Sequence, residues 1–231
     1  PDIVPLVNKL FKMYNSDNFI LSLPSLRLDG FPRDLLKALS RQKKLGLTFA
    51  PEAGNERLCR AINKPVSFED MLSTVATAFD QGWLSLKLYF MVGLPTETAE
   101  DLEGIVRLVG EITRLGKSMM KAPPRINLSL SSFIPKPHTP FQWLAMDSEE
   151  SLEEKQRYVR SRLRPFRSIR IKDHPAKSSV LEGVFSRGDR RLGPALVRAW
   201  NRGARFDSWK DFFAFSHWAE SFRADNLNYR V

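Results

Sequence analysis

The stretch LKLYFMVGLPTET (residues 86–98) decides the fold of this chain, and FAPEAGNERL (residues 49–58) repeats its pattern upstream. Each stretch is a β-rich run that breaks into a glycine turn, and a helix with acidic residues near its start follows. Parallel α/β folds usually build their ligand sites at this junction, the carboxyl end of a strand. The two stretches therefore indicate ligand-binding loops on a parallel α/β fold.

The remaining periodicity extends this prediction along the chain. Helices are predicted at residues 1–14, 32–44, 55–62, 67–81 and 98–115, and strands at residues 19–28, 46–52, 85–92 and 126–133. Alternating helices and strands are typical of βα units around a parallel sheet, either open or part of a barrel. From about residue 143 a charged helix, a short strand at residues 168–172 and a mainly helical segment follow. We place the domain boundary between residues 1–146 and residues 147–231.

Composition limits the kinds of site that the chain can hold. The 231 residues include 42% hydrophobic and 27% charged residues, which is ordinary for a globular protein. No apolar run approaches the ~20 residues of a membrane span, and no signal-peptide pattern opens the chain, so we expect a cytoplasmic protein without membrane segments. The single cysteine, Cys59, excludes an internal disulfide and a self-contained iron–sulfur site, and no metal site is expected.

Side-chain alternation on the predicted strands places polar residues on one face. Asn127, Ser129 and Ser131 share a face, although both faces of a parallel strand are normally buried. Buried polar groups need partners, so a polar face indicates a cavity. We hypothesise one polar pocket, lined by Arg27, Glu52, Lys87, Asn127, Ser129 and Ser131. The alternative is that Arg27 and Glu52 form a scaffold salt bridge.

Three segments, in this order, resemble motifs of the radical S-adenosylmethionine (radical SAM) superfamily. PEAGNERLCRAINKP (residues 51–65) resembles the E-S-G-S-E-R segment after the fourth barrel strand, with Ala53 and Asn55 in place of two serines. GLPTETAEDL (residues 93–102) resembles the G-[FL]-P-x-E-T segment after the fifth strand. FIPKPHTPFQW (residues 133–143) resembles the sixth-strand segment, with His138 in place of glycine. The resemblance covers residues 1 to about 143 and implies a partial (β/α) barrel of the radical SAM type.

The resemblance implies an enzyme that cleaves S-adenosylmethionine with a [4Fe–4S] cluster to give a 5′-deoxyadenosyl radical. The cluster motif Cys-x3-Cys-x2-Cys is absent, and Cys59 cannot replace three thiolates. We therefore expect the later part of a longer protein, inactive without its missing N-terminal part. By resemblance Glu52 and Gly54 would lie near the methionine and ribose of the cofactor, and Gly93 near its adenine. Arg27 and Lys87 are candidates for binding its carboxylate or the substrate; no catalytic residue is assigned.

The last third of the chain suggests a subfamily and an alternative function. Residues 173–209 resemble the C-terminal region of Fe–S oxidoreductases with a cobalamin-binding-like domain ahead of the barrel, so cobalamin is a candidate cofactor. Residues 157–172 contain no acidic residue and form an arginine row of seven basic residues: Arg157, Arg160, Arg162, Arg164, Arg167, Arg170 and Lys172. This row indicates either RNA phosphate binding or a solvated helix face. The alternative function is a non-catalytic RNA- or protein-binding module. The aromatic residues at 209–218 are predicted to be core.

Overall fold

A computed structural model describes residues 3–14, 21, 33–40 and 46–229. Helices α1 (Ile3–Met13) and α2 (Arg33–Leu39) lie within two of the predicted helices. The predicted strand at residues 19–28, with Arg27, lies outside the described residues except for Leu21. The chain divides into two compact units: unit 1 is Pro1–Ser131 with Arg157–Asp173, and unit 2 is Ser132–Gln156 with His174–Val231.

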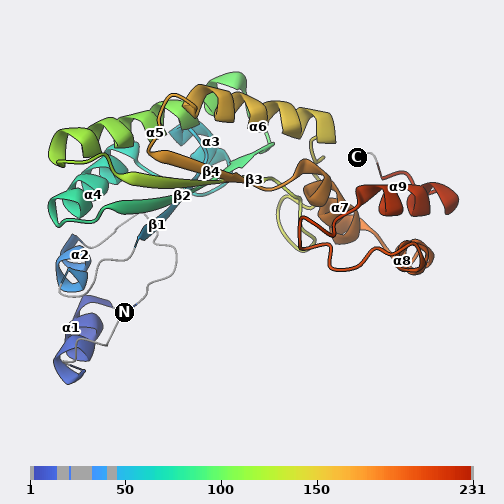
Figure 1. Cartoon of the computed structure of the whole chain (residues 1–231), viewed down its shortest axis with the longest axis horizontal. Coiled ribbons are helices and arrows are strands. Elements are labelled where there is room, and N and C mark those ends of the chain that lie inside the picture. The colour runs from blue at the N-terminus through green and yellow to red at the C-terminus, as the bar shows by residue number, and fades with distance from the viewer. Residues whose placement is uncertain (1–2, 15–20, 22–32, 41–45, 230–231) are drawn as a thin grey trace. The chain divides into compact units, whose positions relative to one another are not determined.

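A four-stranded sheet forms the centre of unit 1. Its strands β1 (Leu47–Glu52), β2 (Ser85–Val92), β3 (Arg125–Ser132) and β4 (Ile169–Asp173) lie side by side in chain order. β1 pairs in parallel with β2, and β3 pairs in parallel with β4. Figure 1 shows the strands beneath the helices α5 (Ala99–Met119) and α6 (Glu149–Leu163). The predicted α/β class with a parallel sheet is confirmed.

The helices begin where the sequence supplies capping side chains. The Asn55 side chain accepts a hydrogen bond from Leu58 N at 2.8 Å at the start of α3 (Glu56–Ala61). Ser67 does the same for Asp70 N at 3.1 Å at the start of α4 (Phe68–Asp80). A capping box formed by Thr98 and Asp101 is present at the start of α5. Side-chain oxygens thus satisfy backbone donors that the first helical turn leaves free.

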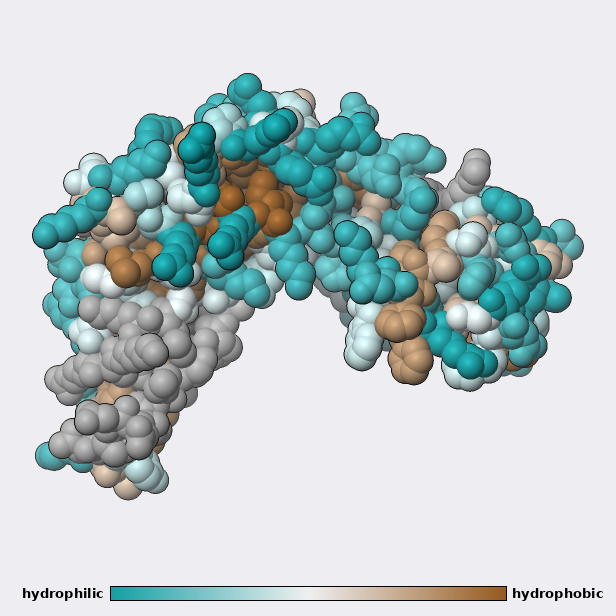
Figure 2. Space-filling model, in the orientation of Figure 1, coloured by the Kyte–Doolittle hydropathy of each residue, from teal (hydrophilic) through white to brown (hydrophobic). Residues whose placement is uncertain are grey.

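One face of the sheet forms the core of unit 1. On β2 and β3 buried and exposed side chains alternate, and the buried set faces the helices. This set includes Leu86, Leu88, Phe90, Ile126, Leu128 and Leu130. Figure 2 shows hydrophobic atoms between the helical layer and the strands, and mostly hydrophilic atoms over the rest of the coloured surface of this unit. The opposite face of the sheet stays accessible, which a parallel sheet rarely permits.

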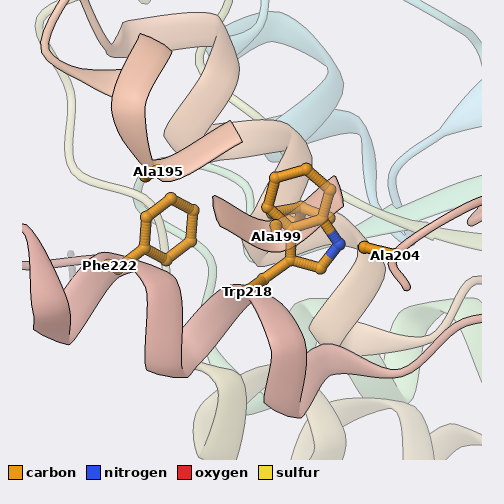
Figure 3. Packing of buried hydrophobic residues seen from close by; sticks show 6 residues of the cluster. Ala195, Ala199, Ala204, Trp218 and Phe222 are labelled. Atoms are coloured by element: carbon orange, nitrogen blue, oxygen red, sulfur yellow. The ribbon is translucent and has the colours of Figure 1, made fainter. Parts of the chain in front are cut away.

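Unit 2 is mainly helical, with a small core of its own. Helices α7 (Ala176–Arg187), α8 (Leu192–Asn201) and α9 (Phe215–Ala224) supply most of it. In Figure 3 the aromatic rings of Trp218 and Phe222 on α9 lie against alanines of α8 and Ala204. The two ring centroids are 6.2 Å apart, and the indole N–H of Trp218 donates to Asp207 at 3.1 Å.

Two expectations for this region differ from the structure. Trp209 is 64% exposed and Phe212 54% exposed, so the core prediction is wrong for both. Residues 202–214 form turns rather than a helix, and the two rings pack on Phe206 instead. The units also do not divide at a single cut near residue 146, because β4 joins the sheet beside β3 and Ile126 N donates to Ser168 O at 3.0 Å.

None of the helices in the described part of the chain combines the length and the apolar character that a membrane crossing requires.

Candidate functional site

The loops after β1 and β2 are tied together by one carboxylate. Asp101, in the first turn of α5, is 1% exposed. Its oxygens accept hydrogen bonds from the Asn55 side-chain amide and the Arg57 guanidinium, both in the segment after β1. They also accept from Thr98 N at 2.7 Å and Thr98 Oγ1 at 3.0 Å, in the segment after β2. Arg57 donates in addition to Thr96 O at 3.0 Å.

The electrostatics of this network keep Asp101 ionised. Burial alone raises the pKa of a carboxyl group, but the hydrogen bonds from Thr98 and the Arg57 guanidinium outweigh it. The pKa of Asp101 therefore lies below the usual aspartate value. A permanent buried anion, held by donors from both loops, fixes the mutual position of the two segments that resemble cofactor-binding motifs.

Gly54 and Gly104 allow the first loop to approach α5 closely. A Cβ on Gly54 would lie 2.0 Å from Asp101 O and 2.3 Å from Ile105 N. A Cβ on Gly104 would lie 2.2 Å from Gly54 O. These are backbone atoms that cannot move aside cheaply, so both positions require glycine for packing. Proximity of Gly54 to the cofactor ribose stays a prediction.

Glu52 lies at the carboxyl end of β1, as predicted. The register between β1 and β2 shifts between Phe49 and Glu52, and Glu52 has φ +69°. Its side chain turns to Lys64, whose Nζ lies 2.7 Å from Glu52 Oε1. The pair is half-buried. Any cationic group of a ligand that approaches Glu52 would have to compete with Lys64.

Gly93 forms the turn that ends β2. Its φ of +78° is a left-handed conformation that glycine adopts without steric cost. Its N–H donates to Glu97 Oε1 at 3.0 Å, so the loop carries its own anion at this position. The turn explains the glycine structurally, and its proximity to an adenine stays a prediction.

The accessible face of the sheet gathers the other predicted residues. Thr48 pairs with Lys87, and Ser129 pairs with Lys172, so these four side chains leave the sheet on the same side as Asn127. Ser131 follows Ser129 on that face. Lys87 lies over the Tyr89 ring, with Nζ 4.6 Å from its centroid. The structure thus brings Lys87, Asn127, Ser129 and Ser131 to one polar face; their role in binding is not tested by it, and the same holds for the Arg27–Glu52 alternative.

The described residues do not fit an iron–sulfur cluster. The Cys59 thiol is fully buried and donates to Pro51 O at 3.5 Å. Burial raises the pKa of Cys59 to about 11, whereas a cluster ligand must be a thiolate. Within the described ranges, no three His, Cys, Asp or Glu side chains lie close enough together to hold a metal ion.

The third predicted motif, residues 133–143, folds within unit 2 as a series of turns. His138 there has φ +59°, a conformation that favours glycine, the residue of the resembled segment. Its N–H donates to Gln142 Oε1 at 3.2 Å. The backbone turn is therefore kept despite the substitution.

The predicted arginine row is divided by the structure. Arg160 pairs with Asp173, and Arg162 pairs with Glu103 at 3.1 Å. Arg157, Arg164 and Arg167 are exposed and have no acidic partner among the described residues. The remaining two members, at 170 and 172, lie on β4 rather than on the helix.

Asp101, Arg57 and Lys64 are the residues that sequence reasoning missed. Asp101 had a local signal, its position three residues after Thr98, which indicated a helix cap only. Its bond to Asn55, 46 residues earlier, has no local signal.

Comparison with known proteins gives a family match and a similar fold. Residues 1–109 match the family model described as "Radical SAM superfamily". "Uncharacterized protein MJ0966" of Methanocaldococcus jannaschii is 36% identical over 176 residues, which cover 76% of this chain and 37% of that protein. The solved structure of coproporphyrinogen III oxidase (HemN) from Escherichia coli, described as a radical SAM enzyme, superposes with a TM-score of 0.55 and 16% identity over 70% of this chain and 37% of that one. The chain thus spans little more than a third of either protein.

Proposed function

We propose that this chain supplies the later strands of the barrel of a radical SAM enzyme whose cluster ligands lie outside these 231 residues. One observation carries the proposal. The two segments that resemble cofactor-binding motifs follow adjacent parallel strands, and Asp101 locks them together at the carboxyl end of the sheet. Ligands of such folds bind at this end.

In this proposal the chain binds and orients S-adenosylmethionine without holding the cluster. The reduced cluster and S-adenosylmethionine together supply the 5′-deoxyadenosyl radical in enzymes of this kind. Glu52 and the loops at Gly54 and Gly93 contact the cofactor. Lys64 neutralises Glu52, so a cationic group of the cofactor would have to compete with Lys64 for this carboxylate. The face with Asn127, Ser129 and Ser131 contacts the substrate.

Cobalamin use belongs to the whole protein and is supported only by the resemblance of residues 173–209. Purification of the complete protein after growth with labelled cobalamin tests it. Stoichiometric retention supports cobalamin dependence, and a label-free protein with full activity would exclude it.

The first experiment compares this chain with the complete open reading frame that contains it. After anaerobic reconstitution with iron and sulfide, the complete protein should carry the ~4 irons of a [4Fe–4S] cluster and form 5′-deoxyadenosine from S-adenosylmethionine. This chain should carry no stoichiometric iron. A [4Fe–4S] spectrum from this chain alone, or a reading frame that encodes no cysteine motif, would refute the proposal.

The alternative, a non-catalytic RNA- or protein-binding module, is favoured by one observation. Arg157, Arg164 and Arg167 are exposed without acidic partners in the described part of the chain. RNA affinity that falls steeply with salt, and that Arg164→Gln/Arg167→Gln lowers, would support it. A flat salt profile would exclude it.

A further inference from the structure

Four cationic side chains stand on the accessible face of the sheet. Lys87 on β2, Arg125 on β3, and Arg170 and Lys172 on β4 are all exposed. Each alternates with a buried or half-buried residue, so the strand geometry, and not a flexible loop, directs these side chains to that face.

The strand register places these cations close together. Asn127 pairs with Arg170, and Ser129 pairs with Lys172. Arg125 N donates to Leu84 O at 2.9 Å, which by the parallel hydrogen-bond pattern aligns Arg125 with the residue after Leu84. Counting two residues along both strands then sets Asn127 beside Lys87. Lys87 and Arg170 are thus about 10 Å apart at Cα, and Arg170 and Lys172 about 7 Å.

No carboxylate of the described residues neutralises this cluster. Glu52, at the tip of β1, is taken by Lys64 at 2.7 Å. Asp173 lies on the opposite face of β4 and pairs with Arg160. Lys87 contacts the Tyr89 ring and has no acidic partner in the part of the chain that the structure describes. Four like charges on one rigid surface repel each other, and an anion between them relieves this repulsion.

Neutral hydrogen-bonding groups fill the space between the cations. The Asn127 amide lies between Lys87 and Arg170, and the Ser129 hydroxyl lies beside Lys172. Such groups orient the oxygens of carboxylates and phosphates, while the cations supply most of the attraction.

We propose that this face binds a small molecule with at least two anionic groups, carboxylates or phosphates, and that this molecule is of the substrate's chemical class. That this molecule belongs to the substrate's class rests on the proposed function, whereas anion binding by the face does not. A small polyanion fits better than RNA, because single-stranded RNA is bound by stacking on several aromatic rings. Tyr89 is the aromatic residue of this face in the described strands, and Lys87 covers its ring.

Isothermal titration calorimetry with the full 231-residue chain tests the proposal without cluster or cofactor. The probes are tripolyphosphate, citrate, orthophosphate and a short oligouridylate. The test variant is Arg170→Gln/Lys172→Gln. The matched control is Arg164→Gln/Arg167→Gln, which removes the same charge from exposed residues before β4. Circular dichroism confirms that both variants keep the native fold.

We expect tripolyphosphate or citrate to bind more tightly than orthophosphate. Arg170→Gln/Lys172→Gln should weaken that binding about tenfold, and the control less than about twofold. Preference for tripolyphosphate would identify phosphate groups, and preference for citrate carboxylates. Equal losses in both variants, no preference over orthophosphate, or oligouridylate bound most tightly would overturn the proposal. Because no radical chemistry is involved, these failures would leave the proposed function intact.

Discussion

Replacing Asp101 with Asn should uncouple the two loops at the carboxyl end of β1 and β2. The new side chain has nearly the same shape but no charge. Its NH2 group is a donor and faces other donors, whose hydrogen bonds the carboxylate accepted. The contacts at risk are those of Asn55, Arg57 and Thr98. Removing this one charge therefore weakens the carboxylate-centred contacts between the two loops, whereas the hydrogen bond from Arg57 to Thr96 O stays.

The expected loss of unfolding free energy is about 2–4 kcal/mol. One charge-assisted hydrogen bond contributes about 1.5–3 kcal/mol, and a buried donor left facing another donor adds about 1 kcal/mol. The Arg57 side chain is 49% exposed, so water compensates most of its share. For a chain of this size the loss corresponds to a fall in Tm of about 5–12 °C.

The measurement combines urea denaturation with hydrogen exchange of peptides from α3 and α5, which reports on unit 1 separately. The matched control is Glu100→Gln, the same charge change one residue earlier on a side chain that is 78% exposed. The control should cost less than about 0.5 kcal/mol. If the Asp101→Asn variant were within about 0.5 kcal/mol of the control, the carboxylate would not hold the loops.

The pH dependence gives a second check on the same group. The folded state lowers the pKa of Asp101, so its contribution to stability is present above the unfolded-state pKa of about 3.9 and is lost as the pH falls through the lower folded-state value. The stability difference between wild type and Asp101→Asn should be constant from about pH 5 to 8 and should shrink toward pH 3. A difference that grew on acidification would contradict the assignment.

Three further predictions test packing. In urea denaturation, Gly54→Ala should lower the unfolding free energy by about 2 kcal/mol or more, because the new methyl group meets backbone atoms of α5. The control Gly193→Ala should be neutral or slightly stabilising, because its new methyl group has no atom within 4 Å. Cys59 should resist a thiol reagent at about pH 8 until urea is added; rapid labelling of the native chain would contradict its burial and its raised pKa of about 11. Phe222→Ala should lower the unfolding free energy of unit 2 by about 3–5 kcal/mol, since Phe222 is fully buried against Trp218. The change in tryptophan fluorescence should then occur at a lower urea concentration. An unchanged urea midpoint would show that α9 does not depend on this core.

Local signals in the sequence were sufficient for the strands and caps of unit 1. Alternating apolar residues on β2 and β3 predicted which face is buried, because side-chain direction along a strand is fixed by the backbone. The caps at Asn55, Ser67 and Thr98 follow from the same kind of local chemistry, since each side chain bonds within three residues. The polar face at Asn127 was equally visible.

Tertiary structure alone decided which distant groups meet. Asp101 accepts a hydrogen bond from Asn55, 46 positions earlier, and Gly54 contacts Gly104, 50 positions later. Strand β4 pairs with β3 although a charged helix lies between them in the sequence. The exposure of Trp209 depended on residues 202–214 forming turns rather than the predicted helix. Helical and strand periodicity show how the apolar and polar residues of one segment are distributed over its faces. A contact between two segments depends instead on where the folded chain places them. That is why the sequence indicated the motif loops, and only the folded chain showed the buried carboxylate that joins them.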